Sequence, residues 1–182
     1  MIHIMVYIEG MNKMPESHKT RIMQIAAVPF DEYGVMKNLA PFNEFADRSH
    51  PPHTVDNPET VEWWRSQPIW GQMQRKQDKY GLKPVDLIQA FNEWVNSIAV
   101  NDEEGKVTLW ACHPEYDITA IYAYMVEYGI EPNWPFYAVR DYATVRAAHS
   151  NLNMGRVTHW ADEDIVRQVD VLVQCCRQGW EL

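Results

Sequence analysis

The sequence predicts an α/β protein in which helices flank a mixed five-stranded sheet. Apolar residues alternate along residues 2–8, which is typical of a strand, and two more extended segments follow within residues 21–45. From there on, helical segments alternate with short extended ones, which is typical of crossover connections in a sheet covered by helices. These observations predict an antiparallel arrangement of the first three strands, followed by strands that join the sheet through helices.

The first strand is expected at residues 2–8 and ends beside Glu9. The apolar run at residues 21–31 predicts the second strand, and residues 32–34 predict a hairpin turn. The third strand is expected at residues 35–45. Pro41 within it indicates a strand end or a sheet edge, because proline cannot donate a hydrogen bond to a neighbouring strand.

Three helices are expected next, at residues 56–67, 69–81 and 83–100. Proline and glutamate in the first turn favour the start of the first helix. The third has the clearest helical spacing of apolar residues, at Ile88, Phe91, Val95 and Ile98.

The remaining chain predicts a strand at residues 106–112, a helix at 114–129, a short strand at 135–141, a brief helix at 142–150 and a last helix at 159–179. A loop is expected between the last two helices. The buried stripe of the last helix is predicted to comprise Ile165, Val169, Leu172, Val173 and Cys176.

Bulk composition predicts one domain over residues 1–182 with a substantial core, since 46% of the residues are hydrophobic and 23% are charged. A net charge of −9 argues against extensive coating of nucleic acid or of an acidic membrane surface. The three cysteines show no zinc-binding spacing, which favours a reducing, cytoplasmic location. No apolar run is long enough to span a membrane, so no membrane partner is expected.

Four residues stand where strands end or helices begin: Glu9, Asp117, His159 and Asp164. If the sheet brings them together, their carboxylates could bind a hard divalent cation, and the histidine could deprotonate a water molecule. Each also has a simpler interpretation. Asp117 and Asp164 suit the first turns of helices, and His159 suits a helix cap or an exposed surface.

The order and context of these residues resemble the DnaQ-like 3′–5′ exonucleases of the DEDDh group, which have a ribonuclease H-like fold. "YIEGM" is similar to the first motif of that family, "HPEYDITAI" to the second and "HWADED" to the third. "EWW" and "WPF…VRD" resemble further segments of the branch that contains the mycobacterial 3′–5′ exoribonuclease and phage-encoded exonuclease A-like proteins. The similarity extends over nearly the whole chain.

The resemblance implies hydrolysis of single-stranded DNA or RNA from the 3′ end to nucleoside 5′-monophosphates, with two Mg²⁺ or Mn²⁺ ions. It implies that Glu9, Asp117 and Asp164 serve as metal ligands and His159 as the general base. A homodimer is also consistent with the family.

Tyr7 occupies the position of the aspartate that begins the first family motif and that bridges the two metal ions. A phenol, with a pKa of about 10, is neutral at pH 7 and binds Mg²⁺ poorly. The substitution predicts weak metal binding and slow or absent cleavage. The alternative function is therefore a catalytically impaired homologue that binds nucleic acid or a protein partner.

Four further residues are candidates for substrate binding. Trp63 and Trp64 could stack on a terminal base, although one of two adjacent helical residues is expected in the core. Met11 could wedge against the 3′-terminal nucleotide or belong to the core. Arg140 could contact a phosphate or pair with a nearby acid.

Overall fold

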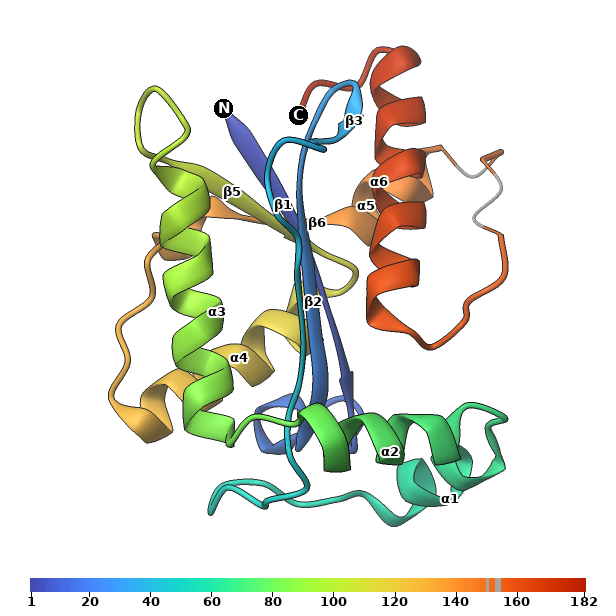
Figure 1. Cartoon of the computed structure of the whole chain (residues 1–182). Helices are drawn as coiled ribbons and strands as arrows, with labels where there is room; N and C mark the ends of the chain where they lie inside the picture. The colour runs from blue at the N-terminus through green and yellow to red at the C-terminus, as the bar shows by residue number, and fades with distance from the viewer. Residues whose placement is uncertain (150, 153–154) are drawn as a thin grey trace.

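The computed structural model describes residues 1–149, 151–152 and 155–182, which form one mixed sheet with helices on both faces (Figure 1). Within these residues the sheet contains β1 (Ile2–Gly10), β2 (Ile22–Asp31), β3 (Gly34–Val35), β4 (Phe42–Phe45), β5 (Val107–Ala111) and β6 (Val139–Asp141). The strand order is β3-β2-β1-β5-β6, and β4 also pairs with β2. β1 and β2 are antiparallel, as are the pairs that β3 and β4 form with β2, whereas β5 and β6 join in parallel. The predicted fold class is confirmed.

The helices are α1 (Pro58–Ser66), α2 (Trp70–Tyr80), α3 (Pro84–Ala99), α4 (Pro114–Tyr128), α5 (Tyr142–Ala148) and α6 (Ala161–Arg177). Figure 1 shows α3 and α4 on one face of the sheet, α5 and α6 on the other, and α1 and α2 across one end. Short 3₁₀ helices occupy Ser17–Lys19 and Phe136–Ala138.

β1 is buried on both faces, so its side chains alternate between two apolar layers. Ile4 and Val6 belong to the layer under α3 and α4, whereas Met5 belongs to the layer under α6. The predicted helical stripe of α3 is buried in the first layer, and the α6 stripe in the second. The prediction for one member of the α6 stripe was wrong, because Cys175 rather than Cys176 is fully buried.

The predicted third strand at residues 35–45 is divided into β3 and β4, which pair with different stretches of the same strand, β2. Between them, Leu39 donates a backbone hydrogen bond to Met36, which forms a turn, and Pro41 has no N–H to donate. The edge of the sheet is therefore interrupted. The fifth predicted strand is shorter than expected, because residues 136–138 form a 3₁₀ helix and only Val139–Asp141 pair with β5.

The predicted helices are present with bounds shifted by no more than two residues, and β1 extends two residues beyond its expected end. The expected end of the helix at residues 142–150, and residues 153–154 of the following loop, lie outside the described residues. Among the residues described, no helix has both the length and the apolar character needed to cross a membrane.

His3 on β1 gives the fold a testable pH dependence. It is 6% exposed, accepts a hydrogen bond from Trp110 Nε1 at 3.1 Å, and burial lowers its pKa to about 4. In the unfolded chain the imidazole takes up a proton near pH 6.5, so stability contributed by the neutral native form is lost as the pH falls from 6.5 towards 4. We expect a loss of roughly 2 kcal/mol at pH 5 compared with pH 7.

Denaturant unfolding at both pH values would measure this loss. The control is His3→Gln, which keeps an acceptor near Trp110 but carries no charge in this range. Equal pH dependence of the two proteins would contradict the prediction.

Candidate active site

A pocket of about 510 Å³ lies where β1 ends beside α1, the start of α4 and the segment before α6. Its walls include most of the residues that the sequence singled out. They are Tyr7 and Glu9 from β1, Trp63 and Trp64 from α1, Asp117 from α4, and His159.

Glu9 is held in the pocket by the register of β1. It pairs with Gln24 of β2, immediately before an irregularity between Glu9 and Gly10. The residue is 6% exposed, and its Oε1 has no hydrogen-bond partner among the described residues. Burial, together with the nearby charge of Asp117, raises the pKa of the Glu9 carboxyl well above its usual range.

Asp117 reaches the same strand from α4. The pairing of β1 with β5 ends at Val6 and Ala111, so beyond that point the N–H of Ile8 donates instead to Asp117 Oδ1 at 2.9 Å. Asp117 is 2% exposed, and burial raises its pKa well above the usual range, although the hydrogen bond from Ile8 opposes this shift. Two carboxyl groups thus lie buried at the end of one strand.

His159 lies in the segment that leads into α6. Its backbone is in the left-handed region, with φ of 61°, which is unusual for a residue with a side chain. Its ring lies 4.8 Å from the ring of Trp63, edge to face. Burial lowers the pKa of the imidazole, which keeps it neutral at pH 7 and able to accept a proton.

Asp164 is buried in the first turn of α6, but its carboxylate is already engaged. Oδ1 accepts hydrogen bonds from the N–H and hydroxyl of Thr158, at 3.1 and 3.2 Å, and Oδ2 accepts the N–H of His159 at 3.1 Å. Arg167, one turn further along α6, forms an ion pair with Oδ1. The carboxylate therefore shapes the segment that carries His159.

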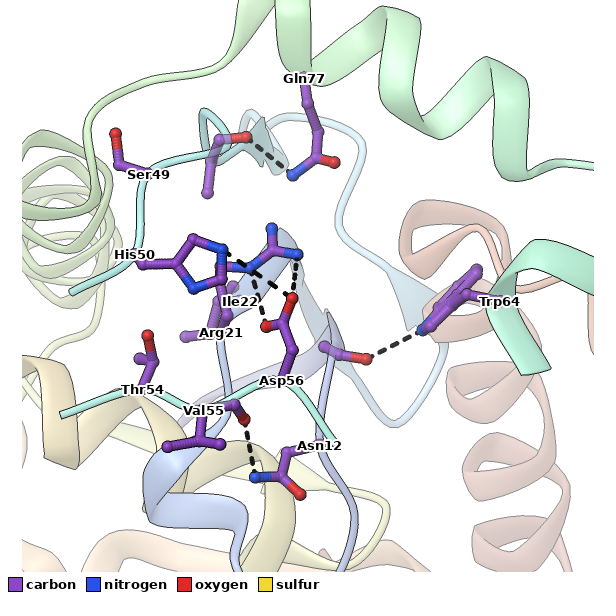
Figure 2. Close-up of polar contacts among 12 residues, drawn as sticks. Asn12, Arg21, Ile22, Ser49, His50, Thr54, Val55, Asp56, Trp64 and Gln77 are labelled. Carbon is purple, nitrogen blue, oxygen red and sulfur yellow. Dashed lines mark hydrogen bonds and ion pairs between the residues drawn. The ribbon is translucent and has the colours of Figure 1, made fainter. Parts of the chain in front are cut away.

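Trp63 and Trp64 differ in the way that adjacent helical positions predict. Trp64 is buried, and its Nε1 donates to Gly10 O at 3.0 Å, which attaches α1 to the end of β1 (Figure 2). Trp63 is 42% exposed and presents its ring to the pocket. Of these two tryptophans, Trp63 is therefore the one whose ring is accessible for stacking on a base.

The loop before α1 is fastened to the same end of the sheet. Arg21, immediately before β2, forms two hydrogen bonds with Asp56, from Nε at 2.9 Å and from Nη2 at 2.7 Å (Figure 2). Asn12 Nδ2 donates to Val55 O at 3.0 Å. Asn57, the residue after Asp56, caps α1, because its side chain accepts hydrogen bonds from N–H groups of the first turn.

Tyr7 stands on the same face of β1 as Glu9, two residues earlier, and lines the pocket. Burial, followed by the nearby charges of Glu9 and Asp117, raises the pKa of its hydroxyl far above the usual value. The phenol is consequently neutral and contributes no charge to a cation.

The carboxylates in the pocket fit one divalent cation held by two residues, rather than a site with three or more carboxylate ligands. Glu9 and Asp117 are buried together, and Glu9 has a free oxygen, so a hard cation would compensate their charge. The Asp164 carboxylate accepts hydrogen bonds from Thr158 and His159 and forms an ion pair with Arg167. In the described part of the chain, no three His, Cys, Asp or Glu residues lie close enough together to hold a metal ion.

Two of the substrate-binding candidates lie outside the pocket walls. Met11 is buried in a cluster with Trp64 and Met73, so it acts as a core residue. Arg140 stands on β6 beside Trp110 and donates to the carbonyl oxygens of Tyr137 and Val139. The structure does not bring Arg140 to the pocket.

Sequence reasoning missed Tyr116 and Asn12, which also line the pocket. Tyr116 donates its hydroxyl to Asn12 O at 2.9 Å and passes close to Gly10, where a Cβ would lie 2.8 Å from that hydroxyl. The aromatic residue before Asp117 in "EYD" was a usable signal for Tyr116. Asn12 stands in an ordinary polar turn and offered none.

The antiparallel start of the sheet and the strands added in parallel have the arrangement of the ribonuclease H-like fold class. The profile of the family described as 3′-5′ exoribonuclease Rv2179c-like domain matches residues 2–172, and the chain belongs to this family. Membership implies a nucleic-acid substrate and divalent metal ions. A search of curated proteins found no match.

Solved structures show the same fold at low sequence identity. The nuclease domain of 3′hExo, a DEDDh family member bound to rAMP, has a TM-score of 0.67 at 11% identity, and the match covers 100% of this chain and 94% of that one. E. coli exonuclease I in complex with a dA16 oligonucleotide has a TM-score of 0.69 at 12% identity, over 97% of this chain and 41% of that one. The zinc-bound exonuclease I–ssDNA complex has a TM-score of 0.70 at 10% identity, over 98% and 41%. The chain thus spans about two fifths of the exonuclease I length.

The buried carboxyl pair predicts an unusual effect of Glu9→Gln. A raised native pKa means that the metal-free protein loses stability as the pH rises above 4.5, the usual carboxyl value. Removing this charge should therefore stabilise the metal-free protein at pH 8 by roughly 1–3 kcal/mol, while reducing the stabilisation that Mn²⁺ provides.

Unfolding in chelator and in excess Mn²⁺ would measure both effects. Glu115→Gln is the control, because Glu115 also lines the pocket but its side chain is 55% exposed. A Glu9→Gln protein that is less stable without metal, or that retains the full Mn²⁺ effect, would contradict the prediction.

Proposed function

We propose that this protein removes nucleotides from the 3′ end of single-stranded nucleic acid and releases nucleoside 5′-monophosphates. The observation that carries this proposal is the convergence of Glu9, Asp117, His159 and the exposed face of Trp63 on one pocket, in a chain that belongs to an exoribonuclease family. The pocket of about 510 Å³ is lined by groups that suit a base, a phosphate-bound cation and a water molecule.

Each of these residues has a distinct role in the proposed reaction. Glu9 and Asp117 would hold Mg²⁺ or Mn²⁺, which when bound supplies Lewis-acid activation of the scissile phosphate and of water. His159 accepts the proton of the attacking water at an unprotonated ring nitrogen. Trp63 stacks on the terminal base and fixes the end of the strand.

Tyr7 limits the rate of this reaction. It stands in the pocket beside Glu9 as a neutral phenol, where a carboxylate would supply a further charge to a cation. Asp164 is not among the residues that line the pocket, and its charge is paired with Arg167. We therefore propose slow hydrolysis for the chain as it stands.

A second candidate function is the binding of single strands without cleavage. Tyr7 and Asp164 favour it, because neither supplies a carboxylate to a cation in the pocket. Cleavage assays on both polymers decide between DNA and RNA. The homodimer and the cytoplasmic location stay predictions.

Replacing Tyr7 with Asp should raise the cleavage rate roughly 100-fold, because it restores a metal-binding carboxylate worth several kcal/mol to the transition state. The assay follows release of nucleoside monophosphates from labelled single-stranded RNA and DNA in Mg²⁺ or Mn²⁺. Tyr7→Phe is the matched control, since it removes the hydroxyl, keeps the bulk and should give no increase.

Equal rates for the wild type and Tyr7→Asp would show that Tyr7 does not limit the chemistry. Cleavage by the aspartate variant alone would favour the binding function for the natural chain. Absence of both cleavage and single-strand binding in every variant would reject the exonuclease proposal.

Trp63→Ala should weaken single-strand binding about tenfold or more, because a stacked base is worth roughly 1–3 kcal/mol. Fluorescence anisotropy of a labelled strand would measure this. The control is Tyr80→Ala, since Tyr80 is an aromatic residue on α2 that is 55% exposed and is absent from the pocket walls. Equal losses in the two variants would show that the binding surface is not this pocket.

A further inference from the structure

Gln24 is a polar residue near the start of the apolar run that forms β2, and it is 0% exposed. It pairs with Glu9 across the two strands, so both side chains lie on the α6 face of the sheet. A buried amide is costly unless its donors and acceptor are satisfied, which makes its partners informative.

The Gln24 amide is bound to the first turn of α6. Its Oε1 accepts the N–H of Ala161 at 3.2 Å, and its Nε2 donates to Asp162 Oδ1 at 3.0 Å and to Asn43 Oδ1 at 2.8 Å. Ala161 comes only two residues after His159. The amide therefore fixes the start of α6, and with it the His159 segment, beside the strand that carries Glu9.

A second contact, from α2, holds the same segment. Lys76 of α2 places its Nζ 4.3 Å from the ring centre of Trp160 and 5.0 Å from that of Phe45. Such contacts between a cation and aromatic rings are attractive. Trp160 lies directly between His159 and Ala161, so the segment is held both by the sheet and by α2.

His159 needs such support because of its backbone. A left-handed conformation in a residue with a side chain costs of the order of 1–3 kcal/mol and persists only where neighbouring groups enforce it. Asp164 fixes the N–H of His159 itself, whereas Gln24 fixes the helix start on the sheet. The direction of the imidazole depends on both.

We infer that Gln24 is a positioning residue, which holds the segment before α6 so that the His159 ring stays against Trp63 in the pocket that Glu9 also lines. This inference rests on the proposed function of His159 as the general base. Gln24 need not contact the substrate. It acts through the backbone of Ala161 and the side chain of Asp162.

The test replaces Gln24 with Met, which has a similar length but cannot form these hydrogen bonds. The matched control is Gln77→Met, because Gln77 is also a buried glutamine, 2% exposed, and donates to a backbone oxygen of Ala46 at 3.1 Å, away from α6 (Figure 2). Both variants are made in the wild-type chain and in the Tyr7→Asp chain, so that the rate is measurable if Tyr7 suppresses it.

Gln24→Met should lower kcat roughly 10- to 100-fold, because displacing a catalytic group by about 1 Å is enough for such a loss. KM and the single-strand dissociation constant should change less than twofold, since Trp63 and α1 are untouched. Gln77→Met should leave kcat within twofold. An unchanged kcat in Gln24→Met, or an equal fall in Gln77→Met, would overturn the inference.

An NMR measurement tests the same inference without any cleavage. The His159 ring lies edge to face on Trp63, so ring currents shift its C–H signals, which the His159→Gln variant would assign. Gln24→Met should move these signals and speed hydrogen exchange at the Ala161 amide, whereas Gln77→Met should do neither. If no variant cleaves nucleic acid, the proposed function fails, but these two signals still decide the role of Gln24.

Asp162→Ala provides a milder variant should Gln24→Met fail to fold, because Asp162 is only partly buried. It removes one of the hydrogen bonds of Gln24 to α6, and should lower kcat about threefold and shift the His159 signals in the same direction. Unshifted His159 signals in this variant would also overturn the inference.

Discussion

The unequal length of β1 and its parallel neighbour β5 is the constraint on which the site depends. Pairing between them stops at Val6 and Ala111, while β1 continues to Gly10. The N–H of Ile8 is buried there and needs an acceptor, which the carboxylate of Asp117 provides from the first turn of α4. The pocket is lined by this end of β1, beyond its pairing with β5, and by the first turn of α4. The hydrogen bond between Ile8 and Asp117 therefore also places a carboxylate in the site.

The placement of the Asp117 carboxylate beside β1 has an electrostatic consequence. Asp117 and Glu9 are both buried, and the pKa of each is raised. A third carboxylate at Tyr7 would add to this repulsion in a metal-free protein, whereas the phenol adds none. Tyr7 is thus compatible with a stable fold and unfavourable for a cation, which links stability and activity at a single position.

Much of the fold was accessible from local patterns. The apolar alternation of β1, the helical spacing of α3 and the stripe of α6 each reflect burial of one or both faces of a single element, which the sequence records directly. The third strand was wrong in its continuity, because Pro41 and the turn at Met36 divide it. Cys175 and Cys176 were exchanged in the α6 stripe, since adjacent helical positions differ by about 100° and a small error in phase decides which one is buried.

The sequence by itself determined which elements form, and it predicted which residues carry chemistry: an acid at the end of a strand, acids in two first turns, a histidine before the last helix, and Tyr7 in place of an expected aspartate. Only the tertiary structure decided how these residues are used. It buried Met11, left Arg140 on β6, exposed Trp63 rather than Trp64, and engaged Asp164 with Thr158, His159 and Arg167. The burial of Met11 and Trp64 depends on contacts between segments far apart in the chain, such as Trp64 with Gly10, which no local pattern encodes. The bonds of Asp164 are local, but they depend on the path of the chain before α6, which the tertiary contacts of Gln24 with Ala161 support.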